Sequence, residues 1–311
     1  MSVTLAAVIP TRNRAGDLCV AVESLLRQTR PPDELIIVDQ SPNDDSVTRV
    51  HALFDAATVT TLVYIHDTTV TGLVDAKRVG SSRATCDVVC FLEDDVVLEP
   101  EYMAAIAEAF DARPDMWGCS GVITNLPHTS PLYIALHRLF FTGIFRDPRV
   151  AISMNALRAP GPLVRCDVLS GGLSAWRREV FARIPFDTRN NFFMFEDMEF
   201  STRVVRAFGP HLYVNARARL EHRGSPVNRD VHGVRQRRKL AEAITFYKKR
   251  RDWPGALSGL LLFMCWSFGE AVQRAAANRS VGPLAGYARG VIDGLQRPLV
   301  RQHQPDRASI P

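Results

Sequence analysis

Over the first 120 residues, short apolar runs that end abruptly in polar residues alternate with amphipathic stretches. Four runs have the length and unbroken apolar character of buried parallel strands: 5–9, 35–38, 62–65 and 88–92. Three helices are expected around them, at 17–28, 72–84 and 100–112. Strands separated by helices build a parallel sheet with right-handed crossovers. The sequence therefore predicts an α/β fold.

Polar clusters follow three of these four runs. They are Pro10-Thr11-Arg12-Asn13-Arg14, Asp39-Gln40-Ser41 and Glu93-Asp94-Asp95. In open α/β sheets, ligands bind beyond the carboxyl ends of the strands. We therefore expect all three clusters to meet at one edge of the sheet and to form a single site there.

The third cluster places three carboxylates, those of Glu93, Asp94 and Asp95, next to one another at the end of an apolar strand. Like charges repel strongly where water is partly excluded. A divalent cation would relieve that repulsion, and carboxylate oxygens suit Mg²⁺ or Mn²⁺. The alternative is an acidic turn that caps the helix beginning near Pro100. Taken alone, the triplet leaves both interpretations open.

The ordered series of clusters resembles family 2 glycosyltransferases over about residues 3–225. The resemblance implies a GT-A fold, which is a nucleotide-binding α/β domain with a mixed, mostly parallel sheet. It also implies an inverting transfer of sugar from a nucleoside-diphosphate-sugar (UDP-, dTDP- or GDP-linked) to a hydroxyl acceptor. A divalent metal, Mg²⁺ or Mn²⁺, is the implied cofactor.

The resemblance also implies the residues that bind the donor nucleotide. Pro10, Thr11 and Arg14 match positions that line the base and ribose. Asp39 matches the carboxylate that recognises the base, although the usual Asp-Asp-Gly-Ser is here Asp39-Gln40-Ser41. Lys77 stands at the arginine position of an Ala-Arg-Asn-x-Gly helix, which implies a contact with the diphosphate. Its alternative is a solvated helix face.

By the same resemblance, the carboxylate triplet matches an Asp-x-Asp motif, with Glu93 in place of the first Asp. Glu93 or Asp94 would then contact the ribose, and Asp95 would bind the metal. His222 matches a histidine that follows the last strand and helps to hold the metal or the diphosphate. A purely structural histidine is the alternative for His222.

Glu196 and Asp197 open a helix and resemble the family's Glu-Asp signature. An acceptor hydroxyl must lose its proton as it attacks the anomeric carbon, and a placed base accelerates such a step by about 10²–10⁴-fold. The resemblance assigns this base to Asp197, with Glu196 as its helper or as a ligand of the acceptor hydroxyl. A carboxylate pair at a helix N-terminus is also favoured by the helix dipole, so the two interpretations are compatible.

The acceptor side is expected in the second half of the chain. Gly171 and Gly172 resemble the stretch under the sugar and acceptor, with an ordinary turn as the alternative. Trp176 could stack on a sugar or lie in the core. Residues 125–165 carry five prolines and are expected to form a loop-rich excursion that shapes the acceptor site.

Charge is distributed unevenly along the chain. Residues 1–200 hold 18 Lys and Arg against 26 Asp and Glu, whereas residues 201–311 hold 20 against 7. We expect a GT-A domain over residues 1–225 and a basic, helical, amphipathic extension over residues 226–311. The apolar run at 256–268 is shorter than the roughly 20 residues that span a bilayer. The extension is therefore expected to lie on a membrane surface, to pack on the body or to form a homodimer face.

The N-terminus shows no basic segment followed by an apolar one, so no secretory signal is expected. The six cysteines lack the spacings of a metal or redox site, which favours a reducing compartment. We expect a cytoplasmic enzyme, peripheral on the inner membrane face, that acts on glycan or lipid-linked acceptors in cell-envelope or capsule synthesis.

Two other functions remain open at this stage. A sugar-phosphate nucleotidyltransferase would need a glycine-rich loop after the first strand, and residues 10–14 contain no glycine. A non-enzymatic, polyanion-binding scaffold would fit the basic tail. That tail contains no recognisable nucleic-acid-binding module, so no nucleic-acid partner is expected.

Overall fold

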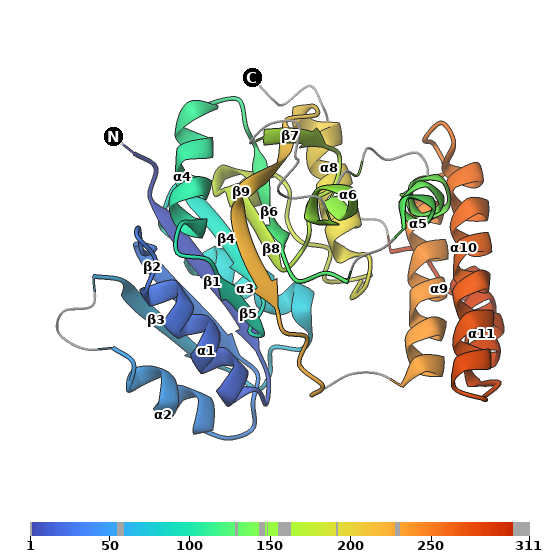
Figure 1. Ribbon diagram of the computed structural model, residues 1–311, viewed down its shortest axis with the longest axis horizontal. Coiled ribbons are helices and arrows are strands. Elements are labelled where there is room, and N and C mark those ends of the chain that lie inside the picture. The colour runs from blue at the N-terminus through green and yellow to red at the C-terminus, as the bar shows by residue number, and fades with distance from the viewer. Residues whose placement is uncertain are drawn as a thin grey trace.

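The computed structural model describes residues 2–54, 59–127, 130–142, 147, 149–154, 163–190, 192–227 and 231–300. Within these residues, nine strands form one sheet in the order β3-β2-β1-β4-β8-β6-β9-β5, and β7 pairs with β9 (Figure 1). The strands are β1 Leu5–Thr11, β2 Glu34–Asp39, β3 Thr61–His66, β4 Val88–Leu92, β5 Val96–Leu98, β6 Gly118–Ile123, β7 Leu163–Cys166, β8 Leu173–Arg177 and β9 Leu212–His222.

The sheet is mixed, as expected. Its first half, β3-β2-β1-β4, is entirely parallel. In its second half, β8 runs antiparallel to both β4 and β6, and β9 runs parallel to β6 but antiparallel to β5 and β7. The parallel half holds the three polar strand ends, and the antiparallel strands bring the later site residues to them.

Helices cover both faces of the sheet, and the alternation of side chains along β1 shows this directly. Leu5, Ala7 and Ile9 join one buried cluster with α1 and α4, whereas Ala6 and Val8 join another that includes residues of α3 and α8. Burial on both faces explains the unbroken apolar runs of β1, β2 and β4, whereas β3, expected to be buried, is the edge strand and is only partly buried. The helices of this body are α1 Ala15–Leu26, α2 Asp45–His51, α3 Leu73–Arg83, α4 Tyr102–Ala112, α5 Pro131–Leu136, the π-helix η1 His137–Thr142, α6 Arg149–Met154, α7 Glu179–Arg183 and α8 Glu196–Phe208.

Three further helices lie side by side at one end of the molecule, next to α5 (Figure 1). They are α9 His232–Lys249, α10 Ala256–Ala277 and α11 Gly282–Gln296. Buried polar contacts join α9 to the body. Glu242 accepts the backbone N–H groups of residues 193, 194 and 195, and Lys249 forms an ion pair with Glu199 at 2.8 Å. The domain boundary at residues 225 and 226 stays a prediction.

Helix α10 is longer than the sequence predicts. The expected apolar run ends at Phe268, but the helix continues to Ala277 because Glu270 forms an ion pair with Lys239 of α9 and an alanine-rich turn follows. The expectation that this segment is too short to span a bilayer is therefore wrong, because the helix has 22 residues. By length and composition α10 could cross a membrane, and 28% of its most apolar 18-residue window is buried inside the protein.

Candidate active site

The polar clusters at the ends of β1, β2 and β4 meet at one edge of the sheet. Thr11 and Asp39 are paired in register at the ends of β1 and β2. The Thr11 hydroxyl donates to Asp94 Oδ2 at 2.7 Å, and Arg14 Nη1 donates to Asp94 Oδ1 at 2.8 Å. The turn between them contains Asn13 in the left-handed region (φ 56°), with its N–H donated to Ser41 Oγ. The single-site arrangement inferred from the sequence is thus present.

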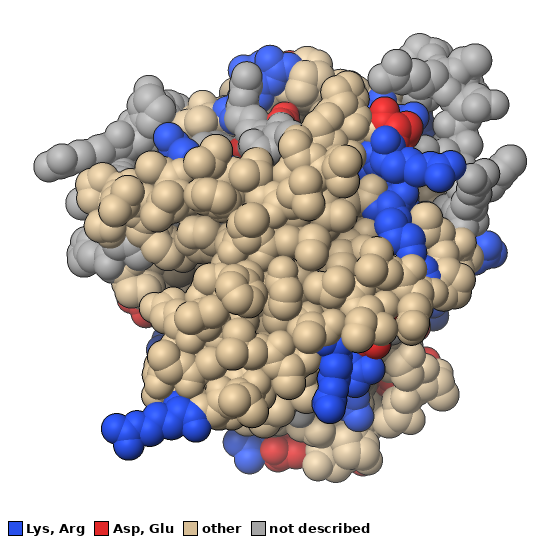
Figure 2. Space-filling model, turned by 90° about the vertical axis from the view of Figure 1, so that its right-hand side faces the viewer, with Lys and Arg blue, Asp and Glu red and all other residues tan. Residues whose placement is uncertain are grey.

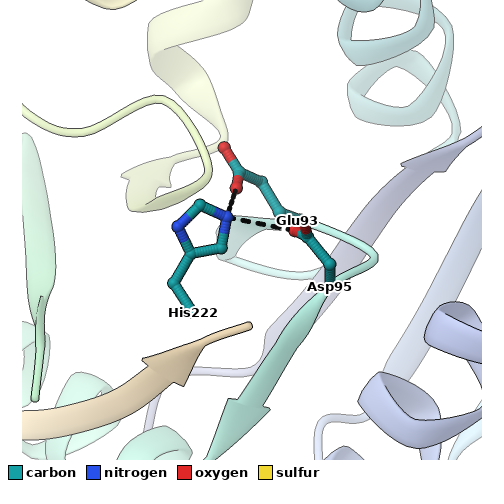
Figure 3. A group of neighbouring side chains, drawn as sticks. All are labelled: Glu93, Asp95 and His222. Carbon is teal, nitrogen blue, oxygen red and sulfur yellow. Dashed lines mark ion pairs between the residues drawn. The ribbon is translucent and has the colours of Figure 1, made fainter. Parts of the chain in front are cut away.

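Glu93, Asp95 and His222 form a compact cluster at this edge (Figure 3). Strand β5 pairs antiparallel with β9, and its first residue, Val96, lies opposite His222. This pairing brings the His222 ring to the turn that follows β4. His222 Nε2 lies 2.8 Å from Glu93 Oε2 and 3.2 Å from Asp95 Oδ1. One atom from each of the three side chains lies within 4.8 Å of the others.

The two aspartates of the triplet have opposite electrostatic environments. Burial raises the pKa of Asp94 to about 6, although Arg14 and Thr11 act against this. Burial would also raise the pKa of Asp95, but hydrogen bonds from His222 and Ser225 outweigh it and lower the pKa to about 2. Hydrogen bonds to Asp95 and Glu93 raise the pKa of His222 to about 10. Of the two aspartates, Asp95 is therefore the one whose charged form the surrounding groups favour more strongly.

The segment after β9 folds back over the acidic turn. The backbone N–H of Ser225 donates to Asp95 Oδ2 at 2.7 Å, and the N–H of Arg223 donates to the Asp95 carbonyl oxygen. Arg14 Nη2 donates to the Val227 carbonyl oxygen at 2.7 Å. Ser225 thus binds the Asp95 oxygen that His222 does not contact, and sequence patterns did not predict these contacts because they use backbone groups.

Gly171 and Gly172 lie between the acidic cluster and the start of α8. A Cβ atom on Gly172 would lie 2.3 Å from the Glu93 side chain, and one on Gly171 would lie 1.9 Å from Glu196 Oε1. Both distances are far below van der Waals contact, so neither position accepts a side chain without displacing a carboxylate. The glycine pair thus leaves room for two carboxylates of the site, and its place under the sugar and acceptor stays a prediction.

Lys77 differs from its expected role at the diphosphate. Its Nζ lies 2.5 Å from Glu196 Oε1 and donates to the Gly171 carbonyl oxygen at 2.9 Å. The Lys77 side chain is only 2% exposed and that of Glu196 is 8% exposed. Lys77 is therefore the buried partner of Glu196 rather than an open cation. Burial raises the pKa of Glu196, and Lys77 opposes this effect.

Asp197 is held by a residue that sequence reasoning missed. Arg149 at the start of α6 donates from Nη1 to Asp197 Oδ2 at 3.0 Å and to Ser170 Oγ at 3.2 Å. The other edge of the same guanidinium is bound by the buried carboxylate of Asp147. Arg149 lies in the proline-rich middle of the chain, where no periodic pattern marks single residues. Much of the expected excursion at 125–165 lies outside the described residues.

Two other expected site residues are buried. Asp39 is fully excluded from solvent, and its carboxylate accepts the Ser41 N–H at 2.8 Å and the Tyr64 hydroxyl at 2.7 Å. Trp176 is a correction, because its ring packs edge-on against Phe200 in the core and its Nε1 donates to Ser174. Strand β8 turns Trp176 toward the face of the sheet that α8 covers, so it offers no surface to a sugar.

Comparison with known proteins identifies the family. The sequence model of glycosyl transferase family 2 matches residues 6–183, which is more than half of the chain. The chain belongs to glycosyl transferase family 2. Membership identifies residues 6–183 as a glycosyltransferase domain, which favours a transferase over the nucleotidyltransferase and scaffold alternatives.

Two curated proteins named as glycosyltransferases or glucuronosyltransferases have similar sequences. The chain is 27% identical over 147 residues to the uncharacterized glycosyltransferase YwdF of Bacillus subtilis (strain 168), covering 47% of this chain and 53% of the relative. It is 26% identical over 123 residues to the glucosyl-dolichyl phosphate glucuronosyltransferase of Haloferax volcanii, covering 40% of this chain and 38% of the relative. The chain spans about half the length, or less, of these relatives.

Solved glycosyltransferases share the fold. The mannosyltransferase PcManGT from Pyrobaculum calidifontis, in complex with GDP-Man and Mn²⁺, superposes with a TM-score of 0.60 at 15% identity, covering 95% of this chain and 88% of that one. GalNAc-T7 with UDP, GalNAc and Mn²⁺ superposes with a TM-score of 0.56 at 16% identity, covering 81% of this chain and 52% of that one. Both likenesses show that the family 2 chain has the GT-A fold.

Proposed function

We propose that this family 2 glycosyltransferase moves a sugar from a nucleoside-diphosphate-sugar (UDP-, dTDP- or GDP-linked) to a hydroxyl acceptor, with inversion at the anomeric carbon. One observation carries the proposal. Glu93 of the Glu93, Asp95 and His222 cluster lies against Gly172, and Glu196, which precedes Asp197, lies against the neighbouring Gly171. A donor diphosphate at the cluster and an acceptor at α8 would thus be neighbours.

The side chains of the cluster fit a divalent metal. Two carboxylates and one imidazole, all within 4.8 Å, offer a mixed oxygen and nitrogen donor set. Oxygen donors suit both Mg²⁺ and Mn²⁺, and these ions complete their shells with phosphate oxygens and water. We therefore assign Asp95, Glu93 and His222 as ligands of Mn²⁺ or Mg²⁺. The bound ion would neutralise the charge that develops on the leaving diphosphate.

The remaining residues of the edge would hold the nucleotide. Thr11 and Arg14 are fixed against Asp94 by hydrogen bonds of 2.7 and 2.8 Å, which keeps them at the end of β1 beside the metal ligands. Arg14 Nε is buried and has no hydrogen-bond partner among the described residues, so it is available to a nucleotide oxygen. Pro10 and Asp39 support this edge from β1 and β2.

On the acceptor side, Asp197 would take the proton of the attacking hydroxyl. Its side chain is 23% exposed, against 8% for that of Glu196, so it is the more accessible of the two carboxylates. Arg149 orients Asp197, and Lys77 fixes Glu196 beside it. We assign Glu196 to binding the acceptor hydroxyl and Asp197 to accepting its proton.

The acceptor and the location are part of the proposal. A glycan or lipid-linked acceptor of cell-envelope or capsule synthesis fits a cytoplasmic enzyme whose basic C-terminal helices could reach the inner face of the membrane. The balance of 20 Lys and Arg against 7 Asp and Glu over residues 201–311 supports this placement.

Release of nucleoside diphosphate from a panel of UDP-, dTDP- and GDP-sugars tests the proposal. The enzyme should release one diphosphate in the presence of Mn²⁺ and a lipid-linked or glycan acceptor, and chelation should abolish the release. Nuclear magnetic resonance of the product should show the anomeric configuration opposite to that of the donor. Turnover that chelation does not reduce with any donor would contradict the proposal. A product that retains the anomeric configuration of the donor would contradict it as well.

A further inference from the structure

The outward face of α10 carries a continuous apolar stripe. Leu257, Leu261, Cys265, Phe268 and Val272 follow one another at intervals of three or four residues, so they lie on one side of the helix. All five are exposed, with exposed fractions of 70% for Leu257 and 54% for Leu261. Large apolar residues aligned in this way on a surface mark an interaction site.

The opposite face of α10 is fully used by the protein. Gly259, Phe263, Ser267 and Ala271 are buried on that side. Gln236 of α9 donates to the Ser267 carbonyl oxygen at 2.8 Å, and the Lys239–Glu270 ion pair ties the two helices further along. A bilayer-spanning α10 would have to break these contacts, so the stripe points to a surface contact instead.

Helix α5 and the π-helix η1 widen the apolar surface. Tyr133 packs against Trp266 of α10 with ring centroids 5.4 Å apart, which places α5 directly beside the stripe. Leu132 is 68% exposed and Leu139 is 54% exposed. The apolar surface therefore spans α5, η1 and α10, and the first two lie more than a hundred residues before α10 in the sequence.

Basic side chains surround this surface. Figure 2 shows a broad uncharged area on this side of the molecule with Lys and Arg mainly around its margin. Residues 232–296 contain 11 Lys and Arg against 4 Asp and Glu. Each of those four carboxylates is already engaged: Glu242 by backbone N–H groups, Asp252 by Arg206, Glu270 by Lys239 and Asp293 by Arg237. The exposed excess of charge is therefore positive.

We propose that the α10 stripe, with α5 and η1 beside it, docks on the surface of an anionic phospholipid bilayer. Apolar side chains would enter the headgroup boundary, and three exposed arginines would meet lipid phosphates: Arg251 just before α10, Arg279 just after it, and Arg289 on the adjoining α11. A second copy of the chain fits less well, because a symmetric contact brings the two basic margins together. The inference rests on the proposed function, for which it selects a lipid-linked acceptor.

The docking surface is connected to the catalytic carboxylates through α9. Glu242 of α9 accepts three backbone N–H groups from residues 193–195, which directly precede Glu196 and Asp197. Helix α9 packs against α10 through the Gln236 and Lys239 contacts. A bilayer under α10 would therefore hold the acceptor end of the site at a fixed height above the lipid surface.

Vesicle co-sedimentation of the full chain tests the proposal. Vesicles of phosphatidylcholine with 30% phosphatidylglycerol, about a third anionic lipid, should bind the protein, and pure phosphatidylcholine should bind it much more weakly. The Leu257→Glu/Leu261→Glu variant should bind the anionic vesicles at least about tenfold more weakly per leucine changed. Arg279→Glu/Arg289→Glu should lose about fivefold per residue and most of its salt dependence.

Val59→Glu is the control, because Val59 is 78% exposed and lies just before β3, which is on the opposite side of the molecule from the C-terminal helices (Figure 1). It should bind vesicles like the wild type. Nucleotide-induced thermal shifts should be unchanged in all variants, which separates a failure of docking from a failure of the donor site. Equal sedimentation of the wild type and the leucine variant would overturn the proposal. A dimer in analytical ultracentrifugation that the leucine variant abolishes, without vesicle binding, would overturn it as well.

Discussion

Lys77 Nζ lies 2.5 Å from Glu196 Oε1, where both side chains are almost completely excluded from water. Removing one partner of such a pair leaves an uncompensated charge in the interior, which costs about 3–5 kcal/mol. We expect Lys77→Met to lower the free energy of unfolding by this amount in urea titrations. The double variant Lys77→Met/Glu196→Gln should recover part of the loss. A Lys77→Met enzyme of normal stability with a raised KM for donor would instead show that Lys77 binds the diphosphate.

Asp197→Asn should retain donor binding and lose transfer. The amide keeps the size of the side chain but cannot accept the proton of the acceptor hydroxyl, so kcat should fall by about 10²–10⁴-fold. Thermal shift with nucleoside diphosphate should be unchanged. Glu23→Gln, on the exposed face of α1, is the matched control and should leave kcat unaltered. Loss of nucleotide binding in Asp197→Asn would place this residue in the donor site instead.

Gly172→Ala should weaken metal binding without removing any ligand. Its Cβ would lie 2.3 Å from the Glu93 side chain and would displace that carboxylate from His222. Loss of such positioning costs about 10–100-fold in metal affinity, which calorimetric titration with Mn²⁺ measures. Gly16→Ala is the control, because nothing lies within 4 Å of its added Cβ. Equal affinities in the two variants would exclude Glu93 from the metal site.

The stability that the contact between the body and α9 contributes should depend on pH. Burial alone would raise the pKa of Glu199, but the ion pairs with Arg203 and Lys249 outweigh it and lower the pKa. The carboxylate therefore stabilises the fold above its unfolded-state pKa of about 4.3, and this contribution is lost as pH falls through the lower folded-state value.

Glu199→Gln should accordingly be less stable than the wild type by about 3–5 kcal/mol above about pH 5. The difference should shrink steadily below about pH 4, as the wild-type carboxyl becomes protonated. Urea unfolding monitored by tryptophan fluorescence measures both curves. Glu23→Gln, which removes an exposed ion pair with Arg27, should change stability by at most about 1 kcal/mol. A difference independent of pH would show that the Glu199 charge contributes nothing.

The parallel half of the fold and the composition of the site edge follow from local patterns. Buried strands of four to seven residues are visible in the sequence as unbroken apolar runs. The residues that follow them are polar, because the edge of the sheet that binds a ligand needs polar side chains. Val88–Leu92 ends at the residue before Glu93, as the sequence predicts. Thr11, Asp94 and Asp95 then meet because neighbouring parallel strands end at the same level.

What the sequence could not provide depends on pairing between distant segments. His222 reaches Glu93 because β9 runs antiparallel to β5, and no local pattern specifies that register. Lys77 and Trp176 carry the residue types of a site but are buried by α8, which follows them by many residues. The charged residues Glu270 and Arg274 made α10 look shorter than it is, because an ion-pair partner on another helix is invisible in its own sequence.

Thermal unfolding with UDP, dTDP or GDP, each with and without Mn²⁺, tests the donor site most directly. A ligand at 100 times its Kd stabilises the folded protein by about 2.7 kcal/mol, which raises Tm by about 5 °C or more for a chain of this size. We predict such a rise for at least one nucleotide, only with Mn²⁺, and its loss in Asp95→Ala. No metal-dependent rise with any of the three, or an unchanged rise in Asp95→Ala, would contradict the assignment of Glu93, Asp95 and His222 as the metal site.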